Sequence, residues 1–287
     1  MKSLVFKGDL QIEEKPIPPI PEGHLLVKIE KAVVGPLERG LVRGLIWVEP
    51  GRIVGMEGYG IVEEPGINAN VERGSIVSSP VITSEGSIIG VHLDGTLSEY
   101  FVVPEKDVEV LPPGNPLKLA LAGTGAIASW IKKRIEGKKA LLIGSGLTNV
   151  LVSYLSGWEV PILAWSQEPN VPAYYFPTKA SACTQEWEAV VVSVLEEMAI
   201  DTATMCIKEG GTIILHPLVA YSKNVFRGKH VKIEVAGRDS LSEGLEAINS
   251  LPQNVFASLV SKERDLSEAL NSPFSRSVID VPGGLTY

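Results

Sequence analysis

Gly144-Ser145-Gly146-Leu147-Thr148-Asn149 is the stretch of sequence that decides the fold. It directly follows the apolar run Ala140–Ile143, typical of a buried strand, and it opens a helical stretch, Leu147–Leu155. In this context Gly144 permits a tight turn, Gly146 lets the backbone approach a pyrophosphate, and the first helical amides supply donors and a favourable dipole. All six residues are therefore candidate dinucleotide-binding residues. The alternative is an ordinary strand-to-helix turn of a doubly wound fold.

Two positions depart from the usual dinucleotide pattern. Asn149 stands where a third glycine usually allows close packing, so we expect the helix to sit further out or the phosphate pocket to be narrower. The acid that binds the adenosine ribose of NAD is due roughly 20 residues further on. Trp165 occupies that place, with Ser166 and Glu168 as substitutes. Trp165 either stacks on adenine or packs against the protein, and we favour packing.

The cofactor prediction depends on cations near the turn. No Lys or Arg lies between Lys139 and Lys179, so this segment offers nothing that would bind the 2′-phosphate of NADP. The sequence therefore predicts NAD or NADP as the cofactor, with NAD favoured.

Strands and helices continue to alternate beyond the turn. The expected elements are the strand Val190–Leu195, the helix Glu196–Lys208, and the strands Thr212–Leu215 and His230–Ala236. Apolar runs buried on both faces are what a parallel sheet covered by helices requires. We predict an α/β fold in which residues 114–251 form a Rossmann dinucleotide-binding domain, a doubly wound parallel sheet.

The N-terminal part has a different pattern. Residues 1–113 contain 11 of the 20 prolines, and their apolar runs are short and bounded by turn residues. The expected strands are Leu26–Val34, Ile53–Val62, Gly74–Ile82 and Thr96–Val103. This pattern predicts a compact all-β domain, which a helix within residues 117–136 joins to the next domain.

Composition excludes several classes of protein. With 45% hydrophobic residues and 21% charged residues, the 287-residue chain is not disordered. Its net charge of −8 disfavours binding to nucleic acid and to anionic membrane surfaces. The N-terminus matches neither a signal peptide nor a membrane anchor. Two cysteines, Cys183 and Cys206, suit a reducing compartment and are too few for a cysteine-rich metal site, so we expect a cytoplasmic protein.

Four further segments carry a resemblance to a known family. They are Gly55–Val62 (GMEGYGIV), Arg73–Val77 (RGSIV), Gly95–Pro104 (GTLSEYFVVP) and Gly210–Leu215 (GGTIIL). Together with the glycine turn, and in this order, they resemble the medium-chain dehydrogenase/reductase family of alcohol dehydrogenase-like and quinone reductase-like enzymes. The resemblance implies a GroES-like β-barrel domain at residues 1–113, the Rossmann domain at 114–251, and a return of residues 252–287 to the barrel domain.

The resemblance also implies that the family's metal sites are missing. Val34, Met56 and Ala120 stand at the places of the zinc ligands, and none of these side chains can coordinate zinc. Pro36 replaces the hydroxyl residue of the proton relay, and Pro80–Val91 has no cysteine for a structural zinc lobe. Zinc-free members need mainly cofactor placement and a pocket for the electrophile.

Other site residues follow from the same resemblance. It places Thr124 near the nicotinamide, and Ser193 and His216 in loops that border the cofactor, although His216 alternatively caps a strand end. For Glu57, a family carboxylate, a structural role is favoured over catalysis. Glu38-Arg39 follows Pro36 in the same loop and could face the cleft, but a solvated surface pair is the favoured expectation.

Two functions remain in competition, and a zinc alcohol dehydrogenase is a distant third. The first is a zinc-independent oxidoreductase that transfers a hydride between a nicotinamide dinucleotide and a small carbonyl, quinone or enoyl substrate held between domains. The alternative is a non-catalytic relative that acts as a binding or scaffold module. The predicted partner is a second copy of the chain, because His230–Ala236 forms a long apolar edge strand that needs covering.

Overall fold

The structure is a computed structural model that describes residues 1–165, 169–222, 230–281 and 283–286. The chain divides into two compact units. The first unit comprises Met1–Ala126, Ser240–Asn249 and Val260–Tyr287, and the second comprises Ile127–Asp239 and Ser250–Leu259. The chain passes from one unit to the other within α3 (Ala122–Ile135), further along than residue 113.

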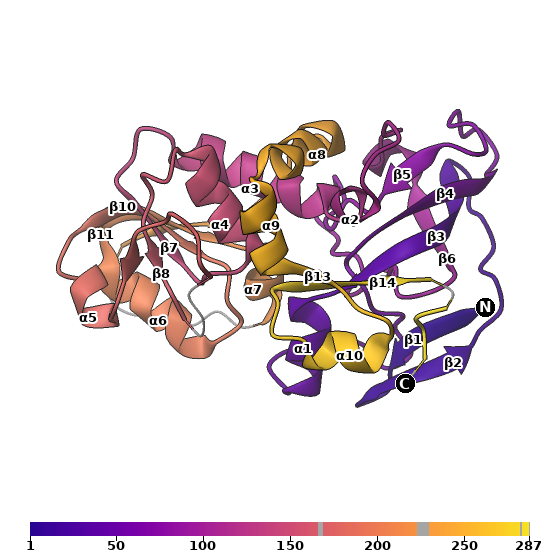
Figure 1. The fold of residues 1–287 in the computed structure, drawn as a ribbon, viewed down its shortest axis with the longest axis horizontal. Helices are drawn as coiled ribbons and strands as arrows, with labels where there is room; N and C mark the ends of the chain where they lie inside the picture. Colours follow the sequence, from indigo (N-terminus) through magenta and orange to yellow (C-terminus); the bar gives the residue numbers. More distant parts are fainter. Residues whose placement is uncertain (166–168, 223–229, 282, 287) are drawn as a thin grey trace. The chain divides into compact units, whose positions relative to one another are not determined.

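The first unit is built on strands that pair antiparallel, except that β13 and β14 pair parallel (Figure 1). Its strands are β1 (Lys2–Phe6), β2 (Leu10–Glu14), β3 (His24–Val34), β4 (Glu57–Pro65), β5 (Ile76–Ser78), β6 (Tyr100–Pro104), β13 (Val260–Lys262) and β14 (Arg276–Asp280). One sheet has the order β13-β14-β3-β4-β5, and β6 also pairs with β3. Because β14 pairs antiparallel with β3, the end of the chain belongs to this unit.

Short helices accompany these strands. They are α1 (Pro36–Val42), the 3₁₀ helix η1 (Glu105–Asp107), α2 (Pro116–Leu119), α8 (Leu241–Ser250) and α10 (Leu266–Asn271). Neither α1 nor the β1-β2 hairpin was predicted from the sequence. Pro36 opens α1, where its missing N–H costs no helical hydrogen bond.

The second unit contains a parallel sheet in the order β12-β11-β10-β7-β8-β9. Its strands are β7 (Ala140–Ile143), β8 (Ile162–Leu163), β9 (Tyr175–Phe176), β10 (Trp187–Val192), β11 (Ile207–Leu215) and β12 (Lys232–Val235). The helices are α4 (Leu147–Leu155), α5 (Lys179–Ala182), α6 (Glu197–Cys206), α7 (Pro217–Ser222) and α9 (Gln253–Leu259). The predicted α/β fold is confirmed, since the apolar runs of β7, β10 and β11 lie in the buried core.

The order of the sheet reverses beside β7. The chain moves from β7 to β8 in one direction across the sheet, and from β10 to β11 in the other. The carboxyl ends of β7 and β10 therefore form a topological switch point, where open α/β sheets bind their ligands.

The two cysteines lie in the second unit and are paired. Cys183, directly after α5, forms a disulfide with Cys206 at the end of α6, with a Cα–Cα distance of 4.3 Å. The sequence interpretation treated these residues as typical of a reducing compartment. It missed the pairing because only the fold brings α5 beside the end of α6.

In the described part of the chain, no helix is long and apolar enough to cross a membrane.

Candidate functional site

The glycine turn connects β7 to α4 as the sequence predicts. Gly144 has a φ of +102°, a backbone conformation that side chains rarely tolerate, and its N–H donates to the Leu163 carbonyl at 2.9 Å. Gly146 is the N-cap of α4 and brings no side chain to cap the helix. Backbone therefore dominates the surface of this turn, as a pyrophosphate site requires.

Asn149 packs between α4 and the end of β7. Its side chain is fully buried, and its Nδ2 donates to the carbonyls of Ile143 and Gly144, at 2.9 Å each. Its Oδ1 is buried with no hydrogen-bond partner among the described residues. The side-chain amide of Asn149 therefore hydrogen-bonds the turn itself. Whether α4 sits further out or the phosphate pocket is narrower stays a prediction.

Three loop residues share the carboxyl edge of the sheet. Ser193 N–H donates to the Ile143 carbonyl at 3.1 Å, and His216 N–H donates to the Val192 carbonyl at 2.9 Å. A Cβ placed on Gly144 would lie 3.2 Å from Ser193 Oγ. The fold thus brings Gly144 and Ser193 side by side at the switch point, with His216 after the next strand.

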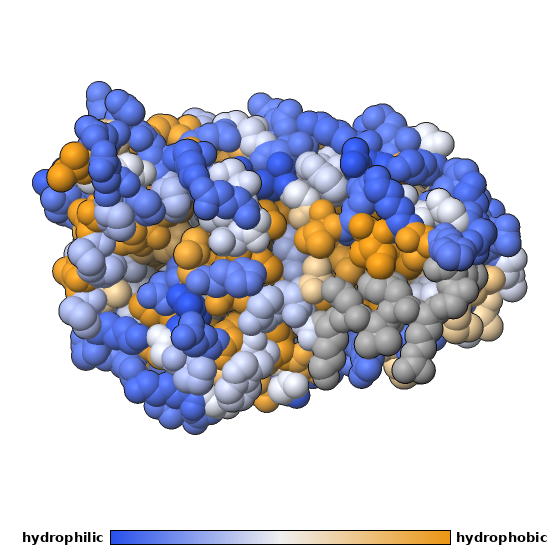
Figure 2. Space-filling view, turned by 180° about the vertical axis from the view of Figure 1, so that it is seen from behind, coloured by the Kyte–Doolittle hydropathy of each residue, from blue (hydrophilic) through white to orange (hydrophobic). Residues whose placement is uncertain are grey.

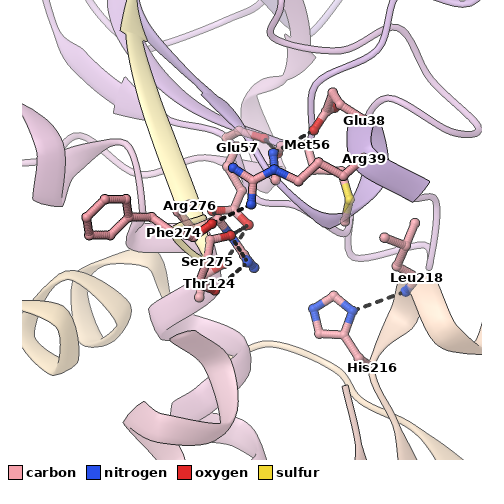
Figure 3. Close-up of polar contacts among 12 residues, drawn as sticks. Glu38, Arg39, Met56, Glu57, Thr124, His216, Leu218, Phe274, Ser275 and Arg276 are labelled. Carbon is pink, nitrogen blue, oxygen red and sulfur yellow. Dashed lines mark hydrogen bonds and ion pairs between the residues drawn. The ribbon is translucent and has the colours of Figure 1, made fainter. Parts of the chain in front are cut away.

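His216 lies directly before α7 and is almost completely buried. Its Nδ1 accepts the Leu218 N–H at 3.3 Å (Figure 3). The ring therefore fastens the strand end to the start of α7, as the capping alternative expects. A role beside a cofactor stays a prediction.

Trp165 lies just beyond the end of β8 and packs against the core of the second unit. The Lys179 ammonium sits over its ring, 4.2 Å from the ring centroid. Ser166 and Glu168 lie outside the described residues. The structure therefore supplies a cation at this edge that the segment between Lys139 and Lys179 lacks.

A buried ion pair marks the first unit (Figure 3). Arg276 Nε donates to Glu57 Oε1 at 2.9 Å and to Oε2 at 3.2 Å, and Thr124 Oγ1 donates to Oε1 at 2.8 Å. The pair forms because β4 and β14 both flank β3. Gly35 leaves room for the arginine, since a Cβ there would lie 3.2 Å from Arg276 Cδ.

The three positions at which the resemblance places zinc ligands all lie in this unit, and their side chains do not suit the metal. Val34, Met56 and Ala120 are buried and offer no nitrogen, thiolate or carboxylate. Both oxygens of the adjacent Glu57 accept from Arg276, whose positive charge disfavours a nearby dication. No group of three or more His, Cys, Asp or Glu in the described ranges could hold a metal ion. These residues do not fit zinc.

Glu38 and Arg39 are not a solvated pair. Glu38 is 1% exposed, and its Oε2 accepts the Gly35 N–H at 2.8 Å, whereas its Oε1 has no partner among the described residues. Burial raises the pKa of the Glu38 carboxyl. Arg39 donates to the carbonyls of Ala269 and Phe274. The surface interpretation is wrong because these partners come from the far end of the chain.

Comparisons with known proteins agree with this architecture. Residues 21–113 match the alcohol dehydrogenase GroES-like domain. Over 267 residues the chain is 32% identical to the zinc-type alcohol dehydrogenase-like protein C337.11 of Schizosaccharomyces pombe, covering 86% of this chain and 79% of that relative.

Two solved structures show the same fold. Acetophenone reductase from Geotrichum candidum, in complex with NAD, has a TM-score of 0.75 at 17% identity, with 97% of this chain and 96% of that chain covered. Glucose dehydrogenase from Haloferax mediterranei, in complex with NADP, zinc and gluconolactone, has a TM-score of 0.72 at 17% identity, with 98% and 99% covered. The solved structures show the fold, whereas the sequence identity with the Schizosaccharomyces pombe relative shows the family. The chain belongs to the medium-chain zinc-type alcohol dehydrogenase family.

Proposed function

We propose that this protein is an NAD(P)-dependent oxidoreductase that works without catalytic zinc. Its substrate is a small carbonyl, quinone or enoyl compound. The observation that carries the proposal is the left-handed Gly144 turn at the switch point between β7 and β10. The structural relatives whose complexes hold NAD or NADP share this fold.

The nucleotide would be held mainly by backbone. Gly144, Ser145 and Gly146 would line the pyrophosphate, and Leu147 and Thr148 begin the helix whose dipole favours negative charge there. Ser193 and His216 follow the neighbouring strands and would border the nicotinamide. When bound, the nicotinamide supplies or accepts the hydride.

The proposal of zinc independence rests on the side chains of the first unit that stand at the expected zinc-ligand positions. A catalytic zinc polarises a substrate carbonyl, and neither Val34 nor Met56 can hold one. Activated electrophiles such as quinones and enones depend least on such polarisation, so we favour them as substrates. Thr124 is held in the first unit by its hydrogen bond to Glu57, and its place near the nicotinamide stays a prediction from the resemblance.

Calorimetric titration with NADH and with NADPH tests this function first. We expect binding of at least one nucleotide, followed by its oxidation when a quinone or enone is added to chelator-treated protein. Absence of binding by both at millimolar concentration would refute the proposal. A tightly held zinc that survives the chelator would refute zinc independence.

The non-catalytic alternative predicts nucleotide binding without turnover. Pro36, the first residue of α1, favours it, because this residue brings no hydroxyl to relay a proton. Turnover of any tested electrophile would exclude this alternative.

We also propose a homodimer through the edge of the parallel sheet. In the described residues β12 pairs only with β11, and its Ile233 and Val235 are 42% and 51% exposed. The surface seen from behind carries several apolar patches among hydrophilic residues (Figure 2). Pairing of two β12 strands would cover this edge. Light scattering should give a dimer that Ile233→Lys dissociates, and a monomeric wild type would refute the idea.

A further inference from the structure

The parallel pairing of β8 with β9 explains how a cation reaches Trp165. Leu163 is the register partner of Phe176, so the residues that follow β8 and β9 leave the sheet at the same edge. Trp165 follows the first strand, and Lys179 follows the second. Residues 140–178 contain no Lys or Arg, and Lys179 is the next residue in the chain.

The lysine is held in place by its helix. Thr178 Oγ1 accepts the Ser181 N–H at 3.0 Å before α5, and the buried Trp187 Nε1 donates to the Ala182 carbonyl at 2.8 Å. The disulfide of Cys183 then joins the end of α5 to α6. Because the backbone around Lys179 is already ordered, less conformational entropy is lost when a ligand binds the lysine side chain.

The ammonium retains hydrogen-bonding capacity in this position. The face of the Trp165 ring attracts the positive charge, but it leaves donors of the Lys179 ammonium able to reach an anion. Within the described ranges Lys179 forms no ion pair with a carboxylate. A phosphate monoester would complete this arrangement with charge-assisted hydrogen bonds.

We propose that Lys179, stacked on Trp165, binds the 2′-phosphate of NADP(H) and makes NADP(H) the preferred nucleotide. The inference rests on the proposed function. In a doubly wound nucleotide site, the end of the strand after the glycine turn lies beside the adenosine ribose. There Trp165 stands in place of the acid that would bind an unmodified ribose, whereas Lys179 offers the charge that a phosphorylated ribose needs. The preference for NAD predicted from sequence alone is thereby reversed.

Calorimetric titrations of the full chain with NADPH, NADH, 2′,5′-ADP and 5′-ADP test the assignment. The two adenosine diphosphates lack nicotinamide and isolate the adenosine end of the site. One lost charge-assisted contact should weaken binding by about tenfold or more. We expect NADPH to bind about tenfold or more tighter than NADH, and 2′,5′-ADP tighter than 5′-ADP by the same factor. Lys179→Met should remove both differences while the affinity for NADH changes by no more than about twofold.

Three controls make the result specific. Lys179→Arg keeps the charge and should retain the preference, and Lys179→Gln repeats the loss with a polar side chain. Lys208→Met removes a lysine elsewhere in the same unit and should leave the relative affinities for NADPH and NADH unchanged. Thermal unfolding of each variant verifies that it is folded.

The outcomes separate the two proposals. If neither nucleotide binds, the proposed function fails. If NADH binds as well as NADPH, or better, the function stands and the assignment of Lys179 is overturned. A Lys179→Met variant that weakens both nucleotides equally would also overturn it, because the lysine would then support the site without recognising the phosphate.

Discussion

The glycine turn of the second unit and the buried charges of the first unit are built in opposite ways. Around Gly144 the important groups are backbone amides and carbonyls, held by a left-handed residue and by the side chain of Asn149. Around Glu57 they are charged side chains whose partner, Arg276, is 219 positions away. The first arrangement is encoded within a few residues, and the second exists only once the sheet has formed.

This difference affects how each region tolerates change. A backbone site accepts most side-chain substitutions around it, provided that the turn keeps its conformation. A buried ion pair tolerates the loss of neither partner alone, because the remaining charge has no water to solvate it. We therefore expect the first unit to be the more sensitive of the two.

The largest effect should come from Arg276→Met. The variant leaves the Glu57 carboxylate buried without its cation, so the free energy of unfolding should fall by about 3–5 kcal/mol. Urea unfolding monitored by tryptophan fluorescence measures the loss. The double variant Glu57→Gln with Arg276→Met removes both charges and should recover part of that stability. A single variant as stable as the wild type would show that the pair contributes only weakly.

The next effect concerns Asn149→Gly, which restores the glycine that the family pattern expects. Two hydrogen bonds to the turn are lost, and glycine is also unfavourable inside α4. We expect about 2–3 kcal/mol of lost stability and no gain in nucleotide affinity, since Asn149 braces the turn. Urea unfolding and calorimetry measure the two quantities. Tighter nucleotide binding by the variant would instead support the crowding predicted from the sequence.

The features that could be predicted from the sequence are those encoded by neighbouring residues, and those that were missed depend on distant residues. The strand Ala140–Ile143 and the helix Leu147–Leu155 have the predicted bounds, because periodicity and glycines specify them locally. The burial of Glu38 was missed because it depends on packing from distant elements. So was Lys179, whose approach to Trp165 depends on the order of β8 and β9. Sequence patterns located the glycine turn between β7 and α4 and missed the side-chain partners that the topology supplies.

The smallest effect is a pH dependence at Glu38. Burial raises its pKa above the ordinary value of 4.5, so over the interval above 4.5 the folded state holds a proton that the unfolded chain has released. The stability of the wild type should therefore decline as pH rises through this interval, and the decline should end above the folded pKa.

Glu38→Gln isolates this effect because glutamine cannot ionise yet keeps an oxygen to accept the Gly35 N–H. The variant should gain stability relative to the wild type as pH rises, and the difference should become constant at higher pH. Urea unfolding at a series of pH values measures it, with the exposed Glu72→Gln as the matched control. A difference that does not change with pH would mean that folding leaves the affinity of Glu38 for its proton unaltered, and that the carboxyl reaches water despite its burial.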